Sequence, residues 1–538
     1  MKRLAVFGTV LAVVLAFTAC DTFVSEVDQP VDEAGSEQFS DPAEAEYLIT
    51  GVQSQWADTH TDVTDIADAL SDELRFGING DATFPTFAQL DAGIINITNN
   101  SVQGALNELH EYRYLADDLL RRVEEDEEFD LSDPSASASE AEVRSVAQAH
   151  GANARYYLAT YFGDPDNPRR GGGVIDTSEF IPSPVLHQRA DDKYAQALAQ
   201  AQAQGDDALV RQIQSARARN ALYAGTHDYS DSGGLQGASA LEAAAQYASQ
   251  GFQEGEGWDV QYDLNTGNGY DGSAGFSRLQ LAVQDGNVDQ LATRSPNPRN
   301  SYKLDGSGEV VVRSHVETVA SNPNEFVRLP LTLVNGSGTV YAGFGPSLAS
   351  EFPSTLLRLP SSAFAGVLAD WRPDGNANEL PTLFGEDAPS VIEFGQGRYA
   401  EETDVSFIGW RELFLIRAEL EVRNSQVSQD LSTGTQSARE LVNTVRASYG
   451  TFEDASGNQV RYLPDLSSSE FGSSTQDQLE TIAQERDRTL FVEGARLPDQ
   501  RRFDDSIVPW HLKDEVDGQK TWQWFRLVQA ETEPNPNF

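Results

Sequence analysis

Apolar side chains recur at helical spacing through most of the first half of the chain, and this pattern limits the fold more than any other feature. In residues 41–70, for example, Leu48, Val52, Trp56 and Val63 fall on one face of a helix. Similar segments, separated by short polar turns, follow at 101–123, 140–162, 183–204, 207–224 and 238–252. Long amphipathic helices with short connections pack as antiparallel hairpins, so we predict a mainly α fold. No strict repeat consensus is present, and any internal repeat is degenerate.

The charge of the chain excludes several kinds of partner. It has 84 acidic and 38 basic residues, which gives a formal net charge of −46. Nucleic acid and anionic membrane surfaces would be repelled, so no nucleic acid partner is expected. Only five of the basic residues are Lys. An acid-rich, Lys-poor surface stays soluble at high salt, and we interpret it as the mark of an acidic proteome in a saline habitat.

The first twenty residues form a targeting segment that ends at the only cysteine. A short basic start precedes an apolar run over residues 4–17, which is too short to span a bilayer comfortably. We therefore predict a secretory signal peptide over residues 1–19. The ending Phe17-Thr18-Ala19-Cys20 resembles a bacterial lipobox, which implies that Cys20 carries acyl chains such as palmitate and anchors the mature protein. The alternative is an ordinary secreted protein whose single cysteine is unmodified.

Composition divides the mature chain into four regions. Residues 20–40 are polar and acidic and are expected to act as a tether. Residues 41–254 carry the helical pattern. Residues 255–391 are rich in Gly, Asn, Ser, Asp and Pro, with strand-like runs at 310–312 and 326–334, so we predict a loop-rich, partly β insertion. Helical patterns return within 392–538, at 404–422, 436–449 and 475–494. An irregular tail then carries three tryptophans that should pack on the core, Trp510, Trp522 and Trp524.

No motif in the chain identifies an enzyme. A nucleophile elbow and a phosphate-binding loop are both missing from the sequence, and His110-Glu111 is followed by Tyr114 where a zinc protease needs its second histidine. A Gly-x-Gly-x-x-Gly match over residues 267–272 lies in a polar stretch and is interpreted as a turn. A pair of catalytic carboxylates for glycoside hydrolysis stays open, because acids are abundant.

No cofactor is predicted, although calcium stays open as a ligand. Asp263, Asn265 and Asp271 could supply oxygen atoms to Ca²⁺. The alternative is an ordinary turn, where the same residue types are common.

One charged stretch stands out near the C-terminus. It begins Glu485-Arg486-Asp487-Arg488 and continues to Glu493-Gly494-Ala495-Arg496 beside an apolar stripe. Opposite charges three residues apart, Glu485 with Arg488 and Glu493 with Arg496, predict a helix that carries a salt-bridge network and ends at Gly494. On physical grounds this stretch is structural and not an active site.

The same stretch resembles the C-terminal motif of the SusD/RagB family of outer-membrane nutrient-uptake lipoproteins, with Thr489 in place of one glutamate of the family pattern. Three other segments match the family in the same order: ARYYLATYFGDP at 154–165, WRELFLIRAEL at 410–420 and LVNTVRA at 441–447. The resemblance covers most of the mature chain and is weakest over 255–391. It implies a mainly α fold of degenerate tetratricopeptide-like hairpins around a variable, loop-rich region.

The resemblance also implies a function. Members of the family are anchored at the surface of the outer membrane, bind a glycan or sometimes a peptide, and pass it to a SusC-like TonB-dependent transporter. They are not enzymes. Two other functions stay open, a lipid-anchored glycoside hydrolase and a tetratricopeptide-like adaptor that binds another protein.

Candidate ligand contacts follow from the chemistry of sugar binding. Neutral sugars stack their apolar faces on aromatic rings, while Asn, Asp and Arg bind the hydroxyls. The loop over 75–98 occupies a place where family members often contact ligand. The candidates are Phe76, Asn79, Asp81, Phe84 and Phe87 in this loop, and Trp258, Tyr262, Tyr270 and Trp371 in or beside the insertion. For each aromatic residue, the alternative is a position in the core.

Overall fold

The structure is a computed structural model. It describes residues 40–71, 73–75, 86, 89–90, 93–226, 233–261, 405–424, 430–453, 456–507, 515–516 and 519–536. Within the insertion it describes the short pieces 295–296, 303–304, 310–312, 323–328, 331–334, 357–360 and 391–394.

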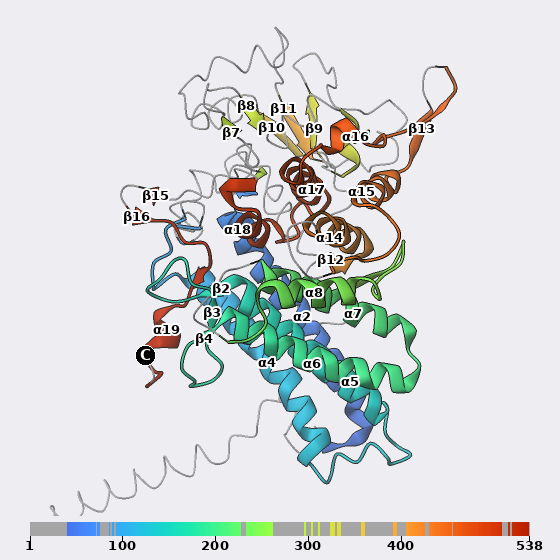
Figure 1. The fold of residues 1–538 in the computed structure, drawn as a ribbon. Helices are drawn as coiled ribbons and strands as arrows, with labels where there is room; N and C mark the ends of the chain where they lie inside the picture. The colour runs from blue at the N-terminus through green and yellow to red at the C-terminus, as the bar shows by residue number, and fades with distance from the viewer. Residues whose placement is uncertain are drawn as a thin grey trace, which may run out of the picture.

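Long helices build the first half of the molecule, as the periodicity predicts (Figure 1). After a 3-10 turn, η2 (Pro42–Glu44), they are α2 (Ala45–Leu70), α4 (Asn100–Glu125), α5 (Glu140–Tyr161), α6 (Ser183–Gln204), α7 (Asp207–Gly225) and α8 (Gly237–Ala248). Each of these helices packs on the next one in this series. Their apolar faces close into one core, which confirms the mainly α, tetratricopeptide-like architecture.

Local sequence fixes where several of these helices begin and end. The side chains of Asn99, Ser139 and Asp206 accept hydrogen bonds from the first free amides of α4, α5 and α7. The backbone of Gly205 ends α6 in the left-handed conformation, with φ of 71°, which costs a glycine little. The helix boundaries are therefore encoded locally, and the packing order comes from the apolar faces.

A cluster of rings joins the helices to the base of the insertion. The ring centroid of Trp56 lies 5.5 Å from that of Trp258 and 5.4 Å from that of Phe407. Trp258 belongs to β5 (Gly257–Val260), and Phe407 belongs to β12 (Val405–Gly409), which pairs antiparallel with β5. The chain therefore leaves for the insertion and returns from it along one two-stranded stem, packed on α2.

The C-terminal helices pack against one another and on α7 and α8. They are α14 (Trp410–Arg423), α15 (Ala438–Ala447), the short α16 (Ser468–Phe471), α17 (Thr475–Thr489) and α18 (Arg496–Ile507). Residues 405–409 form a strand and not the start of a helix, because they pair with β5.

The predicted helix over 475–494 ends earlier than expected. It stops at Thr489, and a turn with positive φ at Val492 and Gly494 leads into α18. The end of α18, residues 503–507, falls in the tail after Arg502 that is predicted to be irregular. Tertiary contacts fix this turn. The amide of Gly494 donates to Asp68 Oδ1 at 3.0 Å, and a Cβ at position 494 would lie 2.7 Å from the methyl group of Thr64.

The end of the chain packs back on the helical body, as expected for two of the three tryptophans. Trp524 is buried and Trp522 packs against the core, whereas Trp510 lies outside the described residues. Here β17 (Phe525–Arg526) pairs parallel with β2 (Phe162–Gly163), and α19 (Gln529–Thr532) follows. A short hairpin of β3 (Gly172–Gly173) and β4 (Ile181–Pro182) lies beside α5 and α6.

The remaining strands are short, and most belong to the insertion, which is partly β as predicted. A three-stranded antiparallel sheet has β11 (Val391–Phe394) between β9 (Leu331–Val334) and β10 (Leu357–Pro360). Residues 323–327 form a 3-10 turn, η3 (Pro323–Val327), so only the second half of the predicted run 326–334 is a strand. The other pairs are β1 (Leu74–Arg75) with β6 (Ser295–Pro296), β7 (Lys303–Leu304) with β8 (Val310–Val312), β13 (Thr451–Glu453) with β14 (Gln459–Arg461), and β15 (Glu515–Val516) with β16 (Gln519–Lys520).

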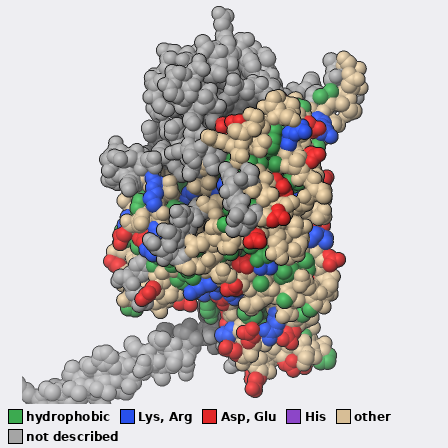
Figure 2. Space-filling view, viewed as in Figure 1, with side chains coloured by type: hydrophobic (Ala, Val, Ile, Leu, Met, Phe, Trp, Pro, Cys, Tyr) green, Lys and Arg blue, Asp and Glu red, His purple; other side chains and the backbone are tan. Residues whose placement is uncertain are grey.

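On the described part of the face shown in Figure 2, acidic and basic side chains intermix, with hydrophobic side chains scattered between them. Within the described residues, no helix is both long and apolar enough to cross a membrane.

Candidate ligand-binding region

Most of the predicted site residues lie outside the described part of the chain. These are Phe76, Asn79, Asp81, Phe84, Phe87, Tyr262, Tyr270 and Trp371, the calcium candidates Asp263, Asn265 and Asp271, and the lipidation candidate Cys20. Their roles stay predictions. The described residues contain no cluster of three or more His, Cys, Asp or Glu that could hold a metal ion.

Trp258 is the only ligand candidate within the described residues, and it is a core side chain. Only 8% of it is exposed. Its ring packs edge-to-face against Phe407 at 5.5 Å and against His150 at 6.1 Å, besides the contact with Trp56. This packing explains why an aromatic residue stands at the base of the insertion.

The strand before the first candidate loop pairs with a strand of the insertion. Strand β1 immediately precedes Phe76, the first candidate of the 75–98 loop, and pairs with β6 in the insertion. Leu74 lies opposite Pro296, and Arg75 lies opposite Ser295. The start of the first loop is therefore hydrogen-bonded to the insertion that carries the other candidates.

A buried arginine fixes the insertion to the C-terminal helices. Arg328 follows η3 and its side chain is fully buried. Its Nε and Nη2 atoms donate to the two oxygens of Glu325 at 2.6 and 3.1 Å. Its Nη1 and Nη2 atoms donate to the two oxygens of Glu485, in α17, at 2.5 and 3.1 Å. Such doubly bidentate pairing suits the planar guanidinium and fixes orientation as well as distance.

Two further arginines complete this network. Arg446 of α15 donates to Glu485 Oε1 at 2.7 Å, and Arg488 reaches Glu325 Oε1 at 3.4 Å. The predicted pairing of Glu485 with Arg488 is therefore wrong, since Glu485 faces Arg328 and Arg446 instead. A tertiary partner from an insertion more than 150 positions away gives no signal in the spacing of the motif.

The next two motif residues face other parts of the molecule. Arg486 donates to Asp499 in α18 at 2.7 Å, and to Glu412 in α14 at 3.3 Å. Asp487 accepts from Arg496, and Arg496 donates in turn to the carbonyl of Ser71 at 3.1 Å. Ser71 ends α2, three residues before β1. One turn of α17 thus contacts the insertion and the C-terminal helices, and through Arg496 it reaches the end of α2.

The arginines around Glu485 and Asp499 keep these two carboxylates charged. Burial alone raises the pKa of Glu485, but Arg328 and Arg446 outweigh it and lower the pKa from 4.5 to about 2. The pKa of Asp499 is lowered in the same way, with Arg486 and Arg502 overcoming the effect of burial. Glu485 and Asp499 are thus ionised at neutral pH, and each of these two buried carboxylates has arginines beside it.

We predict that Arg328→Met destabilises the protein by about 3 kcal/mol or more, because it removes the bidentate partner of two buried carboxylates and leaves each with a single arginine contact. Arg461→Met is the matched control. Arg461 pairs with Asp465 at the surface, where both side chains are about half exposed, and its loss should cost less than about 1 kcal/mol. Urea unfolding of both variants measures the difference, and equal losses would contradict the anchoring role of Arg328.

The ion network also predicts a loss of stability in acid. Because the folded pKa of Glu485 lies below 4.5, its contribution is complete above pH 4.5 and disappears as the pH falls toward 2. Glu485→Gln should therefore be less stable than the wild type at neutral pH and lose less of its unfolding free energy on acidification. Glu254→Gln, at an exposed acid, serves as the control. An acid dependence in Glu485→Gln as steep as in the wild type would contradict this assignment.

Comparisons with known proteins show that solved structures share this architecture, whereas sequence comparisons find no match. No family model matches the sequence, and no curated protein matches it. Solved structures do match. A SusD superfamily protein from Bacteroides vulgatus ATCC 8482 is 12% identical, with a TM-score of 0.51 over 92% of this chain and 98% of its own.

Two further solved structures are similar to this chain over comparable lengths. NanU from B. fragilis is 13% identical, with a TM-score of 0.52 over 95% of this chain and 98% of its own. A SusD homolog from Bacteroides thetaiotaomicron VPI-5482 is 14% identical, with a TM-score of 0.51 over 94% and 98%. The likeness runs through nearly the whole length of each pair of chains, so this chain shares the fold of these solved structures.

Proposed function

We propose that this chain belongs to the SusD/RagB family and acts as a lipid-anchored binding protein at the outer-membrane surface. It binds an oligosaccharide or a related nutrient without cleaving it and delivers it to a SusC-like TonB-dependent transporter. The observation that carries the proposal is the fold shared with SusD superfamily proteins along more than 90% of the chain. The lipobox-like ending at Cys20 and the C-terminal motif support it independently.

The arrangement of the loops supports a binding role. The stem of β5 and β12, the pairing of β1 with β6, and the Arg328 network fix three points of the loop-rich regions on a rigid helical body. Binding residues are commonly carried by loops on such a scaffold. The aromatic and amide side chains of the 75–98 loop supply the chemistry that neutral sugars need.

Simultaneous replacement of Phe76, Phe84 and Phe87 by Ala should weaken glycan binding at least about tenfold, since each stacked ring contributes on the order of 1 kcal/mol. A glycan array on residues 21–538 identifies the ligand, and calorimetry then compares the variants. Tyr47→Ala is the control, because Tyr47 is an exposed aromatic residue near the other end of α2.

The same assays separate the rival functions. Unchanged affinity in the triple variant would remove the first loop from the site. Release of shorter sugars, abolished by replacing one Asp or Glu, would establish a glycoside hydrolase instead. Partner binding with no sugar affinity would establish an adaptor. Copurification of a TonB-dependent transporter with the solubilised native protein is the expected result for the delivery role.

Cys20→Ala should abolish acylation and release the protein from the membrane fraction, because a thioether- and amide-linked lipid needs the cysteine sulfur and its amino group. Incorporation of labelled palmitate into whole cells measures this, with Ser25→Ala as a control in the same segment. Labelling that persists in Cys20→Ala would contradict the anchor.

A further inference from the structure

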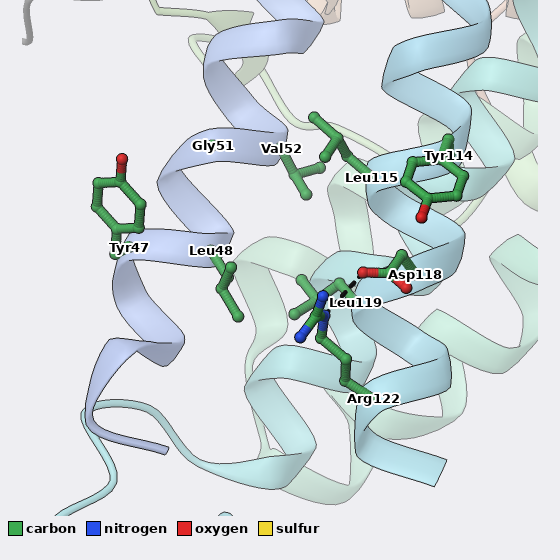
Figure 3. A pocket seen from close by; sticks show the side chains of 9 residues that line it. All are labelled: Tyr47, Leu48, Gly51, Val52, Tyr114, Leu115, Asp118, Leu119 and Arg122. Atoms are coloured by element: carbon green, nitrogen blue, oxygen red, sulfur yellow. Dashed lines mark hydrogen bonds and ion pairs between the residues drawn. The ribbon is translucent and has the colours of Figure 1, made fainter. Parts of the chain in front are cut away.

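An apolar groove lies between α2 and α4 and is flanked by two exposed tyrosines (Figure 3). Among the described residues, the exposed large hydrophobic side chains are Tyr47 at 64%, Tyr114 at 59% and Val460 at 39%. Two of these three therefore line one groove. Exposed apolar side chains that gather at one place mark an interaction site more often than single ones do.

The groove has an apolar floor and a charged end. It encloses about 290 Å³, and its floor is formed by Leu48, Val52, Leu115 and Leu119. Arg122 lies at one end and donates to Asp118 at 2.7 Å. Arg121, next to it, is half exposed. Figure 3 shows the two tyrosines on opposite sides of these side chains, one on each helix. A floor with so few polar groups suits apolar side chains better than sugar hydroxyls.

The chain enters the fold at the charged end of this groove. The hydroxyl of Ser40 donates to Asp126 Oδ2 at 2.9 Å, and Asp126 follows Arg122 by four residues, one helical turn. The carbonyl of Pro42 accepts from the amide of Ser137 at 3.1 Å, which holds the same segment against the helix connection. Ser40, where the described part of the chain begins, therefore lies beside the charged end of the groove.

The sequence before Ser40 has the complementary chemistry. Residues 21–39 place Phe23, Val24, Val27 and Val31 among acidic residues. The nine residues from Val31 to Ser40 can span up to about 30 Å when extended. The groove follows α4 from Arg122 to Tyr114, which is about 12 Å of helix. The segment can therefore turn back along the groove, with valines over the leucine floor and acids near Arg121 and Arg122.

We propose that the N-terminal segment of residues 21–39 docks in the groove between α2 and α4, with its valines between Tyr47 and Tyr114. The linker between Cys20 and the helical body is then shortened, and the body is held in one orientation relative to its anchored end. That consequence rests on the proposed lipid anchor, whereas the docking itself does not.

Disulfide trapping tests the docking directly. The chain from residue 21 onward has no native cysteine, so no other thiol competes with an engineered pair for disulfide formation. Gly51 lines the groove, and a Cβ there meets nothing within 4 Å. Gly104 on α4 is equally open but lies about 30 Å along the helix from Asp126. The test pair is Val31→Cys with Gly51→Cys, and the matched control pair is Val31→Cys with Gly104→Cys.

Docking predicts that the Gly51 pair forms its intramolecular disulfide at least about tenfold faster than the Gly104 pair, because docking raises the local concentration of one thiol near the other. Adding Tyr47→Ser and Tyr114→Ser should remove this advantage, while thermal unfolding shows that the body stays folded. Equal rates for the two pairs would overturn the proposal. So would an advantage that survives the tyrosine changes, or a Gly51→Cys chain that dimerises through this groove. None of these outcomes depends on lipidation or on glycan binding, so failure here is distinct from failure of the proposed function.

Discussion

Three consecutive charged residues of α17 face three different parts of the molecule, and the relative placement of those parts depends on them. Glu485 binds the insertion through Arg328, Arg486 binds α14 and α18, and Asp487 reaches the end of α2 through Arg496. Consecutive positions of a helix point about 100° apart, so one short stretch can contact three surfaces at once. These three residues therefore connect the loop-rich insertion to the helical regions around it.

Buried ion pairs of this kind fix the relative orientation of the segments that they join more than they stabilise the folded protein. Each guanidinium and carboxylate loses its hydration on burial, and the pairing recovers that free energy only when the geometry is good. The bidentate contacts of Arg328 provide that geometry, and apolar side chains in the same place would pack without fixing a direction. In a chain with a net charge of −46, a buried carboxylate without an arginine beside it would also face general repulsion from the rest of the protein.

Low sequence identity and a shared fold are compatible here because the fold rests on patterns that many sequences satisfy. The helical hairpins need apolar stripes, caps such as Asn99 and Ser139, and short connections, and none of these requires a particular core residue. The described anchors of the insertion are its stem of two short strands, the pairing of β6 with β1, and one ion network, so its sequence is free to vary between those points.

The sequence by itself determined the helical class, most helix boundaries and the structural role of the charged C-terminal stretch, because periodicity, caps and charge spacing are local. It could not determine the partners of Glu485 or the early end of α17, since Arg328 and Asp68 lie far away along the chain. Nor could it separate Trp258, a core residue, from the aromatic residues proposed to bind ligand. Only the tertiary structure decided these points, because long-range contacts depend on which faces meet after the helices have packed.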